Sequence, residues 1–196
     1  MSLQVPTVMD ELKAVNTLLE VIGEAPINKL DDTVYIVDVS TARDVLDEVS
    51  TEVQERGWNF NNETDFPLNP SLGEITLPSN VAQLSFPCPT PQMNPVQRGT
   101  RLYNKATRSY TFTDSIKVDI TFLLPFDELP QSARRYITMR AARIFGNRML
   151  GGETLHQITQ QDEDRAEAAL KSQDLKAGQH NFFNNPQSQR ALQRGP

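Results

Sequence analysis

Residues 11–30 read ELKAVNTLLEVIGEAPINKL, a short amphipathic segment that ends abruptly. Gly23 can adopt the left-handed conformation that ends a helix, and Pro26 prevents the helix from resuming. We therefore predict a helix over 11–22 followed by a tight turn. Its apolar residues recur at helical spacing and form one stripe: Leu12, Val15, Leu18 or Leu19, and Ile22.

A second helix is predicted over 40–56, where apolar residues again recur at helical spacing. Ser40 or Thr41 can cap its start, and Gly57 ends it. Between the two helices, VYIVDV at 34–39 is predicted as a short extended piece.

The pattern changes from helical to strand and turn between residues 58 and 124. WNFN alternates, and GEITLP, NVAQLSF and RLYN are short β-prone runs. In SIKVDITFLL, the apolar residues from Ile116 to Phe122 alternate with polar ones, so one face of a sheet is expected to be buried. The proline-rich segment 86–99 is predicted to be a long loop.

Two further helices are predicted after residue 125. Asp127 is the expected N-cap of the first, with Pro130 in its first turn. Its apolar stripe runs from Tyr136 to Met149. This helix is strongly basic, through Arg134, Arg135, Arg140, Arg143 and Arg148.

Gly151 and Gly152 are expected to turn the chain, and Thr154 to cap a last helix that ends near Leu175. Its inward residues are predicted to be Leu155, Ile158, Ala166, Ala169 and Leu170. The remaining segment, 176–196, lacks acidic residues and is rich in Asn, Gln, Gly and Pro. It is either a frayed terminus or an extended arm that orders on a partner, with Phe182, Phe183 and Leu192 as anchors.

These elements predict an α+β fold. A helical hairpin cannot bury its apolar stripe alone, so the two hairpins are expected to pack into a four-helix bundle. The predicted division is an N-terminal hairpin at 1–57, an inserted β-rich domain at 58–124, a C-terminal hairpin at 125–175 and an extended polar arm at 176–196.

The net charge of −6 is unevenly distributed over the 196 residues. Residues 1–65 carry 14 Asp and Glu against 4 Lys and Arg, whereas residues 66–196 carry 11 against 15. This difference in charge has two explanations. Either the acidic and basic parts contact neighbouring copies or partners, or they are simply different solvent-exposed faces. The N-terminus has no basic segment followed by an apolar run, and roughly 18 consecutive apolar residues occur nowhere, so neither a signal peptide nor a spanning helix is expected.

Catalytic patterns are weak. The single Cys88 excludes an intramolecular disulfide, and neither His156 nor His180 has a Cys or a second His four residues away, so a metal site is not expected at either. The acids 162–164 occupy consecutive helical positions, which predicts a solvated face. We expect no catalytic, metal or cofactor site.

Three segments together resemble the tail tubular protein A family of T7-like short-tailed bacteriophages. They are ELKAVNTLLEVIGEAPINKL, then EVQERGWNFN, then the long run LLPFDELPQSARRYITMRAARIFGNRMLGGETLHQITQQDEDRAEAAL. The patterns AVN..L..IGE.P and RGW.FN carry most of the specificity. The resemblance extends over nearly the whole chain.

The resemblance implies a structural adaptor, or gatekeeper, of the virion tail. Such proteins form a twelve-fold ring between the portal and the six-fold tail nozzle, near the attachment of the tail fibres, and DNA passes through the ring. It also implies a location in the short non-contractile tail, after synthesis in the host cytoplasm. The residues expected to bind the portal or a neighbouring subunit are Arg134, Arg135, Arg140, Arg143, Arg148, Phe182, Phe183, Arg190, Leu192 and Arg194.

Two alternatives remain open from the residues alone. One is a virion-associated polysaccharide or peptidoglycan hydrolase that uses carboxylates such as Glu63, Glu74 or Asp127. The other is a DNA-binding module built on the basic helix from Arg134 to Arg148, against which the acidic total charge argues.

Overall fold

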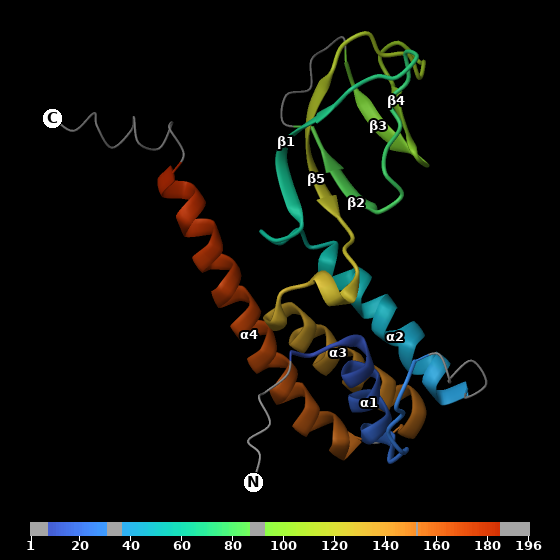
Figure 1. The fold of residues 1–196 in the computed structure, drawn as a ribbon, viewed down its shortest axis with the longest axis vertical. Helices are drawn as coiled ribbons and strands as arrows, with labels where there is room; N and C mark the ends of the chain where they lie inside the picture. Colours follow the sequence, from blue (N-terminus) through green and yellow to red (C-terminus); the bar gives the residue numbers. More distant parts are fainter. Residues whose placement is uncertain (1–7, 31–36, 87–92, 152, 185–196) are drawn as a thin grey trace, which may run out of the picture. The chain divides into compact units, whose positions relative to one another are not determined.

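The computed structural model describes residues 8–30, 37–86, 93–151 and 153–184. For residues 153–159 and 179–184 it describes the backbone only. The chain divides into two compact units. One unit comprises Met1–Val53 and Pro125–Pro196 and holds four helices, and the other comprises Gln54–Leu124 and holds small antiparallel sheets (Figure 1). The protein is therefore a mixed α+β fold in which strands are inserted between N-terminal and C-terminal helices.

Helix α1 spans Glu11–Ile22, as predicted. Asp10 caps it, because its side chain accepts a hydrogen bond from the Lys13 N–H at 2.9 Å. Gly23 ends it at φ 80°, and its N–H donates to the Glu20 carbonyl at 3.1 Å. The buried face of α1 consists of Ala14, Val15, Leu18 and Leu19.

Helix α2 spans Val37–Gln54 and begins earlier than predicted. Ser40 and Thr41 lie inside the helix, and both hydroxyls donate to the Val37 carbonyl at 2.8 Å, so neither residue is the N-cap. The extended piece predicted over 34–39 is wrong for Val37–Val39, which are helical, while 34–36 lie outside the described residues. Val39 is 1% exposed, so apolar packing draws this segment into the helix.

Helix α3 spans Gln131–Leu150 and has Pro130, not Asp127, at its N-cap. Asp127 lies instead in a short 3-10 helix, Phe126–Glu128, and its carboxylate accepts from the Glu11 N–H at 3.3 Å. It thus assists the start of α1, where free backbone N–H groups need acceptors. The buried stripe of α3 ends at Phe145 and Gly146, because Met149 is 42% exposed.

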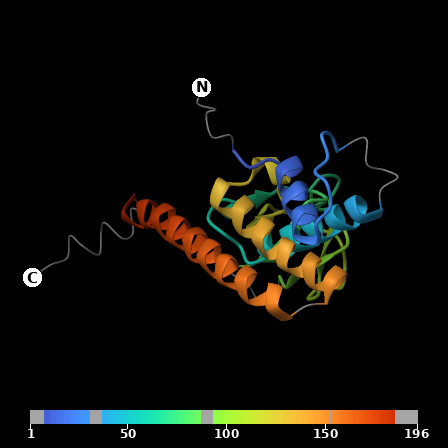
Figure 2. The ribbon, with the colours of Figure 1, turned by 90° about the horizontal axis from the view of Figure 1, so that it is seen from below.

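Helix α4 spans Glu153–Asn184 and continues beyond Leu175, so residues 176–184 are helical rather than extended. Thr154 lies within this helix instead of capping it. Ala166 and Leu170 are buried as predicted, whereas Ala169 is exposed. The side chains of Leu155 and Ile158 lie outside the described set. Figure 2 shows the first part of α4 alongside α3 and its later part extending past it.

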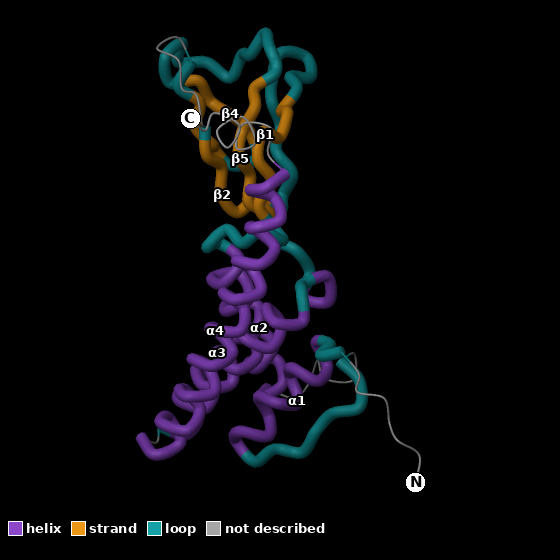
Figure 3. Tube along the Cα trace, turned by 90° about the vertical axis from the view of Figure 1, so that its left-hand side faces the viewer, coloured by secondary structure: helices purple, strands orange, loops and turns teal. Residues whose placement is uncertain are grey.

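The β unit contains a three-stranded antiparallel sheet with the order β1-β5-β2 (Figure 3). Strand β1 is Asn62–Leu68, β2 is Val81–Ser85 and β5 is Ile116–Phe122. Ile116, Val118 and Ile120 of β5 are buried, as their alternation predicted. They join a core cluster with Leu68, Ile75, Leu77, Leu102 and Phe112.

A separate hairpin pairs β3, Pro95–Arg98, with β4, Arg101–Asn104. Strand β3 lies in the segment predicted as a loop. Pro95 has no N–H to donate to a neighbouring strand, but this is tolerated at the first residue of a strand. Residues 87–92 of the same segment lie outside the described residues. Residues 58–61 form a turn before β1 rather than a strand.

Candidate functional site

The first sequence signature, AVN..L..IGE.P, is explained by packing and by one side-chain amide. Ala14 and Val15 are fully buried, and Leu19 is 1% exposed. The Asn16 side chain donates to the Ile27 carbonyl at 3.0 Å and accepts from the Ile27 N–H at 2.8 Å. It therefore holds the segment after Gly23 against the helix that the segment has just left.

The second signature, RGW.FN, marks the point where α2 gives way to the β unit. Gly57 has φ +70°, and a Cβ placed there would lie 3.4 Å from the Thr121 hydroxyl oxygen. Asn61 is 3% exposed, accepts from the Trp58 N–H at 2.9 Å and donates to the Phe122 carbonyl at 2.8 Å. These residues fix the chain's entry into the sheet, which is a structural role.

The arginines of α3 lie among carboxylates of the neighbouring helices. Arg140 binds Glu52 of α2 at 2.6 Å and Glu163 of α4 at 3.0 Å. Arg143 binds the other oxygen of Glu163. Glu163 is only 7% exposed, so the prediction that it belongs to a solvated acidic face is wrong. A buried carboxylate is expected to be paired, and this one bridges two guanidinium groups.

The outer end of α3 continues the pattern. Arg148 binds Glu48 of α2 at 2.9 Å, and this hydrogen-bonded partner lowers the pKa of Glu48. At the inner end, Arg134 donates to the carbonyls of Leu129 and Met9, both at 2.7 Å. The Arg135 side chain is exposed, and it makes no hydrogen bond or ion pair with the described part of the chain.

The acidic and basic parts of the sequence thus partly neutralise each other within the chain. Acids of α2 pair with arginines of α3, a contact that neither sequence alternative included. Burial of Arg140 works against its charge, but hydrogen bonds to Glu52 and Glu163 raise the pKa of Arg140. Three of the five predicted partner-binding arginines on α3, namely Arg140, Arg143 and Arg148, therefore also hold the helices together.

The remaining predicted partner-binding residues belong to the C-terminal segment. Phe182 and Phe183 lie on the last turn of α4, where only the backbone is described. Arg190, Leu192 and Arg194 lie outside the described residues.

Two of the three carboxylates considered for hydrolysis have structural partners. Glu74 pairs with Arg101 at 3.0 Å, and Asp127 accepts from the Glu11 N–H. Glu63 lies on β1 just before a bulge. Among the described residues, no group of three or more His, Cys, Asp or Glu is placed to hold a metal ion.

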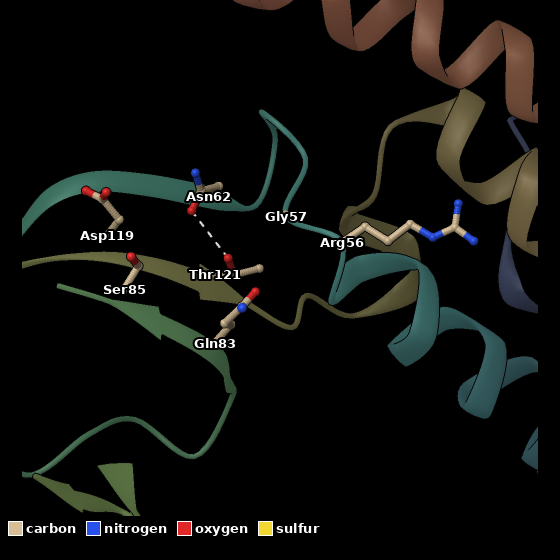
Figure 4. A pocket seen from close by; sticks show the side chains of 7 residues that line it. All are labelled: Arg56, Gly57, Asn62, Gln83, Ser85, Asp119 and Thr121. Atoms are coloured by element: carbon tan, nitrogen blue, oxygen red, sulfur yellow. Dashed lines mark hydrogen bonds between the residues drawn. The ribbon is translucent and has the colours of Figure 1, made fainter. Parts of the chain in front are cut away.

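A polar hollow of about 240 Å³ opens on the face of the three-stranded sheet (Figure 4). Thr121 donates to the Asn62 side chain at 3.3 Å across its floor. Arg56 points away from the strand side chains in this view. The hollow has one carboxylate, from Asp119, one guanidinium, from Arg56, and otherwise neutral groups, so it holds no pair of carboxylates for acid–base chemistry. Its lining is Arg56, Gly57, Asn62, Gln83, Ser85, Asp119 and Thr121.

Comparison with known proteins identifies the chain through its family. Residues 12–180 match the tail tubular protein family, whose members are structural components of bacteriophage tails. No curated protein matches the sequence. No helix in the described residues is long and apolar enough to cross a membrane. Because the match spans most of the chain and both of its structural signatures, the protein belongs to the tail tubular protein family.

Proposed function

We propose that this protein is the ring-forming adaptor of a short phage tail. It joins the portal to the tail nozzle, leaves a channel for DNA and helps to attach the tail fibres. The family match over residues 12–180 carries this proposal, since a tail tubular component must assemble with other tail proteins. The twelve-fold ring, the portal, the nozzle and the fibre are the partners that the resemblance implies.

The later part of α4 supports a role in assembly. Leu170 is the last residue of this helix whose described side chain is buried, yet the helix continues to Asn184. Leu175 is 66% exposed on that continuation. A helix that is mostly polar and exposed gains little packing energy from the rest of its own chain, so contact with a partner surface would stabilise it.

The portal-binding surface then combines the end of α4 with the following segment. Phe182, Phe183 and Leu192 supply apolar anchors, and Arg190 and Arg194 supply charge. Arg135 of α3 adds an exposed guanidinium group. The other arginines of α3 contribute through the packing of the bundle, because they already bind carboxylates or carbonyls of their own subunit.

Light scattering of the purified protein, alone and mixed with its candidate portal, tests this function. We expect a ring-sized species or a portal-dependent increase in mass.

A chain truncated after Leu175 should keep its helical circular dichroism but lose portal binding. Leu175→Glu in the full chain should weaken portal binding, whereas Ala169→Glu, also on an exposed position of α4, serves as the matched control. A wild-type monomer that ignores the portal would refute the proposal.

A further inference from the structure

The β unit carries a basic and aromatic surface that the assembly described above does not use. Residues 75–113 contain no Asp or Glu, although the whole chain has a pI of about 5.0. Their only charged residues are Arg98, Arg101, Lys105 and Arg108, all exposed. This segment therefore presents a local charge of opposite sign to the protein as a whole.

Pairing within the β3–β4 hairpin places two of these arginines beside a tyrosine on one face. Arg98 is opposite Arg101, and Val96 is opposite Tyr103. Side chains alternate along a strand, so these residues share the outer face. Leu102 and Asn104 occupy the other face and are buried.

The outer-face side chains stack on one another. The Arg98 guanidinium lies 3.6 Å from the Tyr103 ring centre, and the Arg101 guanidinium lies 4.5 Å from that of Tyr110. The two tyrosine rings meet edge to face at 5.0 Å. We call Arg98, Arg101, Tyr103 and Tyr110 the arginine–tyrosine cluster. Such stacking orders long side chains before any partner arrives, which lowers the entropic cost of binding.

An exposed apolar side chain adjoins this cluster. Leu72 and Gly73 are the central residues of a tight turn closed by two hydrogen bonds between Ser71 and Glu74. Leu72 is fully exposed, at 105%, and has φ +52°, a conformation that disfavours leucine. Glu74 connects the turn to the cluster, because it pairs with Arg101 and bridges to Thr111.

Arginine and tyrosine are enriched at protein interfaces, and an apolar anchor beside them favours a protein partner over nucleic acid. A surface of matching charge exists on this chain. Helix α2 carries Asp38, Asp44, Asp47, Glu48 and Glu52 against Arg43 alone. Asp44 and Asp47 are exposed, and neither is bound by the arginines of α3.

We propose that the arginine–tyrosine cluster of one subunit binds the acidic helix α2 of a second copy. The contact joins two different surfaces of the same chain, which is the head-to-tail type that closes into a ring. This inference rests on the proposed ring and names the surfaces that form it.

Charge exchange tests the contact by light scattering of the full chain. Arg98→Glu with Arg101→Glu should shift the protein from ring to monomer and lower the association constant by at least about tenfold. Lys29→Glu with Lys117→Glu makes the same change in total charge at exposed positions elsewhere and should leave the ring intact. Adding Asp44→Arg with Asp47→Arg to the first pair should restore the ring.

Circular dichroism and thermal unfolding verify that each variant is folded. Rings of the Arg98→Glu, Arg101→Glu variant, or failure of the folded four-substitution variant to reassemble, would overturn the inference while leaving the adaptor function standing. Wild-type protein that neither associates nor binds a portal would overturn both. If the arginine substitutions abolish binding of duplex DNA but not ring formation, the cluster is assigned to nucleic acid and the subunit contact is wrong.

Discussion

At the scale of single residues, Glu163 connects α3 to α4 by accepting hydrogen bonds from both Arg140 and Arg143. Its side chain is 9% exposed, and each arginine side chain is 20% exposed. Glu163→Gln should therefore lower the free energy of unfolding by about 1–3 kcal/mol, because two largely buried cations lose a charged acceptor. Urea unfolding measures the change.

The adjacent Asp164 gives the matched control, since it is exposed on the same helix. Asp164→Asn should change the stability by less than about 0.5 kcal/mol. Equal effects of the two substitutions would mean that Glu163 is not a structural acid.

Asp47 provides a prediction about pH. Asp47 is exposed, but its carboxylate is partly shielded from water, and this partial desolvation raises the pKa of Asp47 above its ordinary value of 3.8; Arg43 lowers that pKa, and Asp44 raises it further. The folded protein therefore binds the Asp47 proton more tightly than the unfolded chain does. Its contribution to the free energy of unfolding is fully present below pH 3.8 and is lost as the pH rises through the folded-state pKa. Asp47→Asn should raise the Tm at about pH 7 and leave it unchanged at about pH 3. A gain of equal size at both pH values would contradict ionisation as the cause.

At the scale of elements, Gly23 decides where α1 ends. It has φ +80°, and a Cβ added there would meet no atom within 4 Å, so the cost of a side chain is purely conformational. Gly23→Ala should lower the stability by about 1 kcal/mol, and Gly23→Asn by less, because asparagine tolerates the left-handed conformation better. Thermal unfolding of both variants measures this order. A reversed order would show that crowding, not backbone conformation, limits the position.

Local signals explain which elements the sequence could predict. Helix α1 combines an apolar stripe with a glycine stop, and β5 alternates cleanly, so both were predicted correctly. Strand β1 was missed because NETDFPL contains Pro67 and a bulge, and only its pairing with β5 makes it extended. The start of α2 was misplaced since β-branched Val37 and Val39 favour strands, and packing overrides that preference.

At the scale of the whole molecule, the sequence does not show which acidic residues pair with which arginines. Counting residues revealed an acidic N-terminal part and a basic helix, but not that Glu48 and Glu52 pair with Arg148 and Arg140. Such pairs join residues far apart in the chain, and their formation depends on the way the helices pack. The family motifs, by contrast, were readable, and the structure gives them physical roles in Asn16 and Asn61.

Two leucines of α4 separate the stability of the subunit from its assembly. Leu170 is 1% exposed and Leu175 is 66% exposed on the same helix. Leu170→Ala should lower the free energy of unfolding by about 2–4 kcal/mol, because it leaves a cavity in the bundle. Leu175→Ala removes the same atoms from a solvated position and should change it by less than about 0.5 kcal/mol.

Binding to the portal should respond in the opposite way, once measured at a temperature where both variants are folded. Leu175→Ala is expected to weaken portal binding in light-scattering titrations, because its side chain is available to a partner. Leu170→Ala should bind normally, since its side chain is already packed within the subunit. If Leu175→Ala changed stability as much as Leu170→Ala, the later part of α4 would pack on its own subunit, and another surface would have to carry the portal contact.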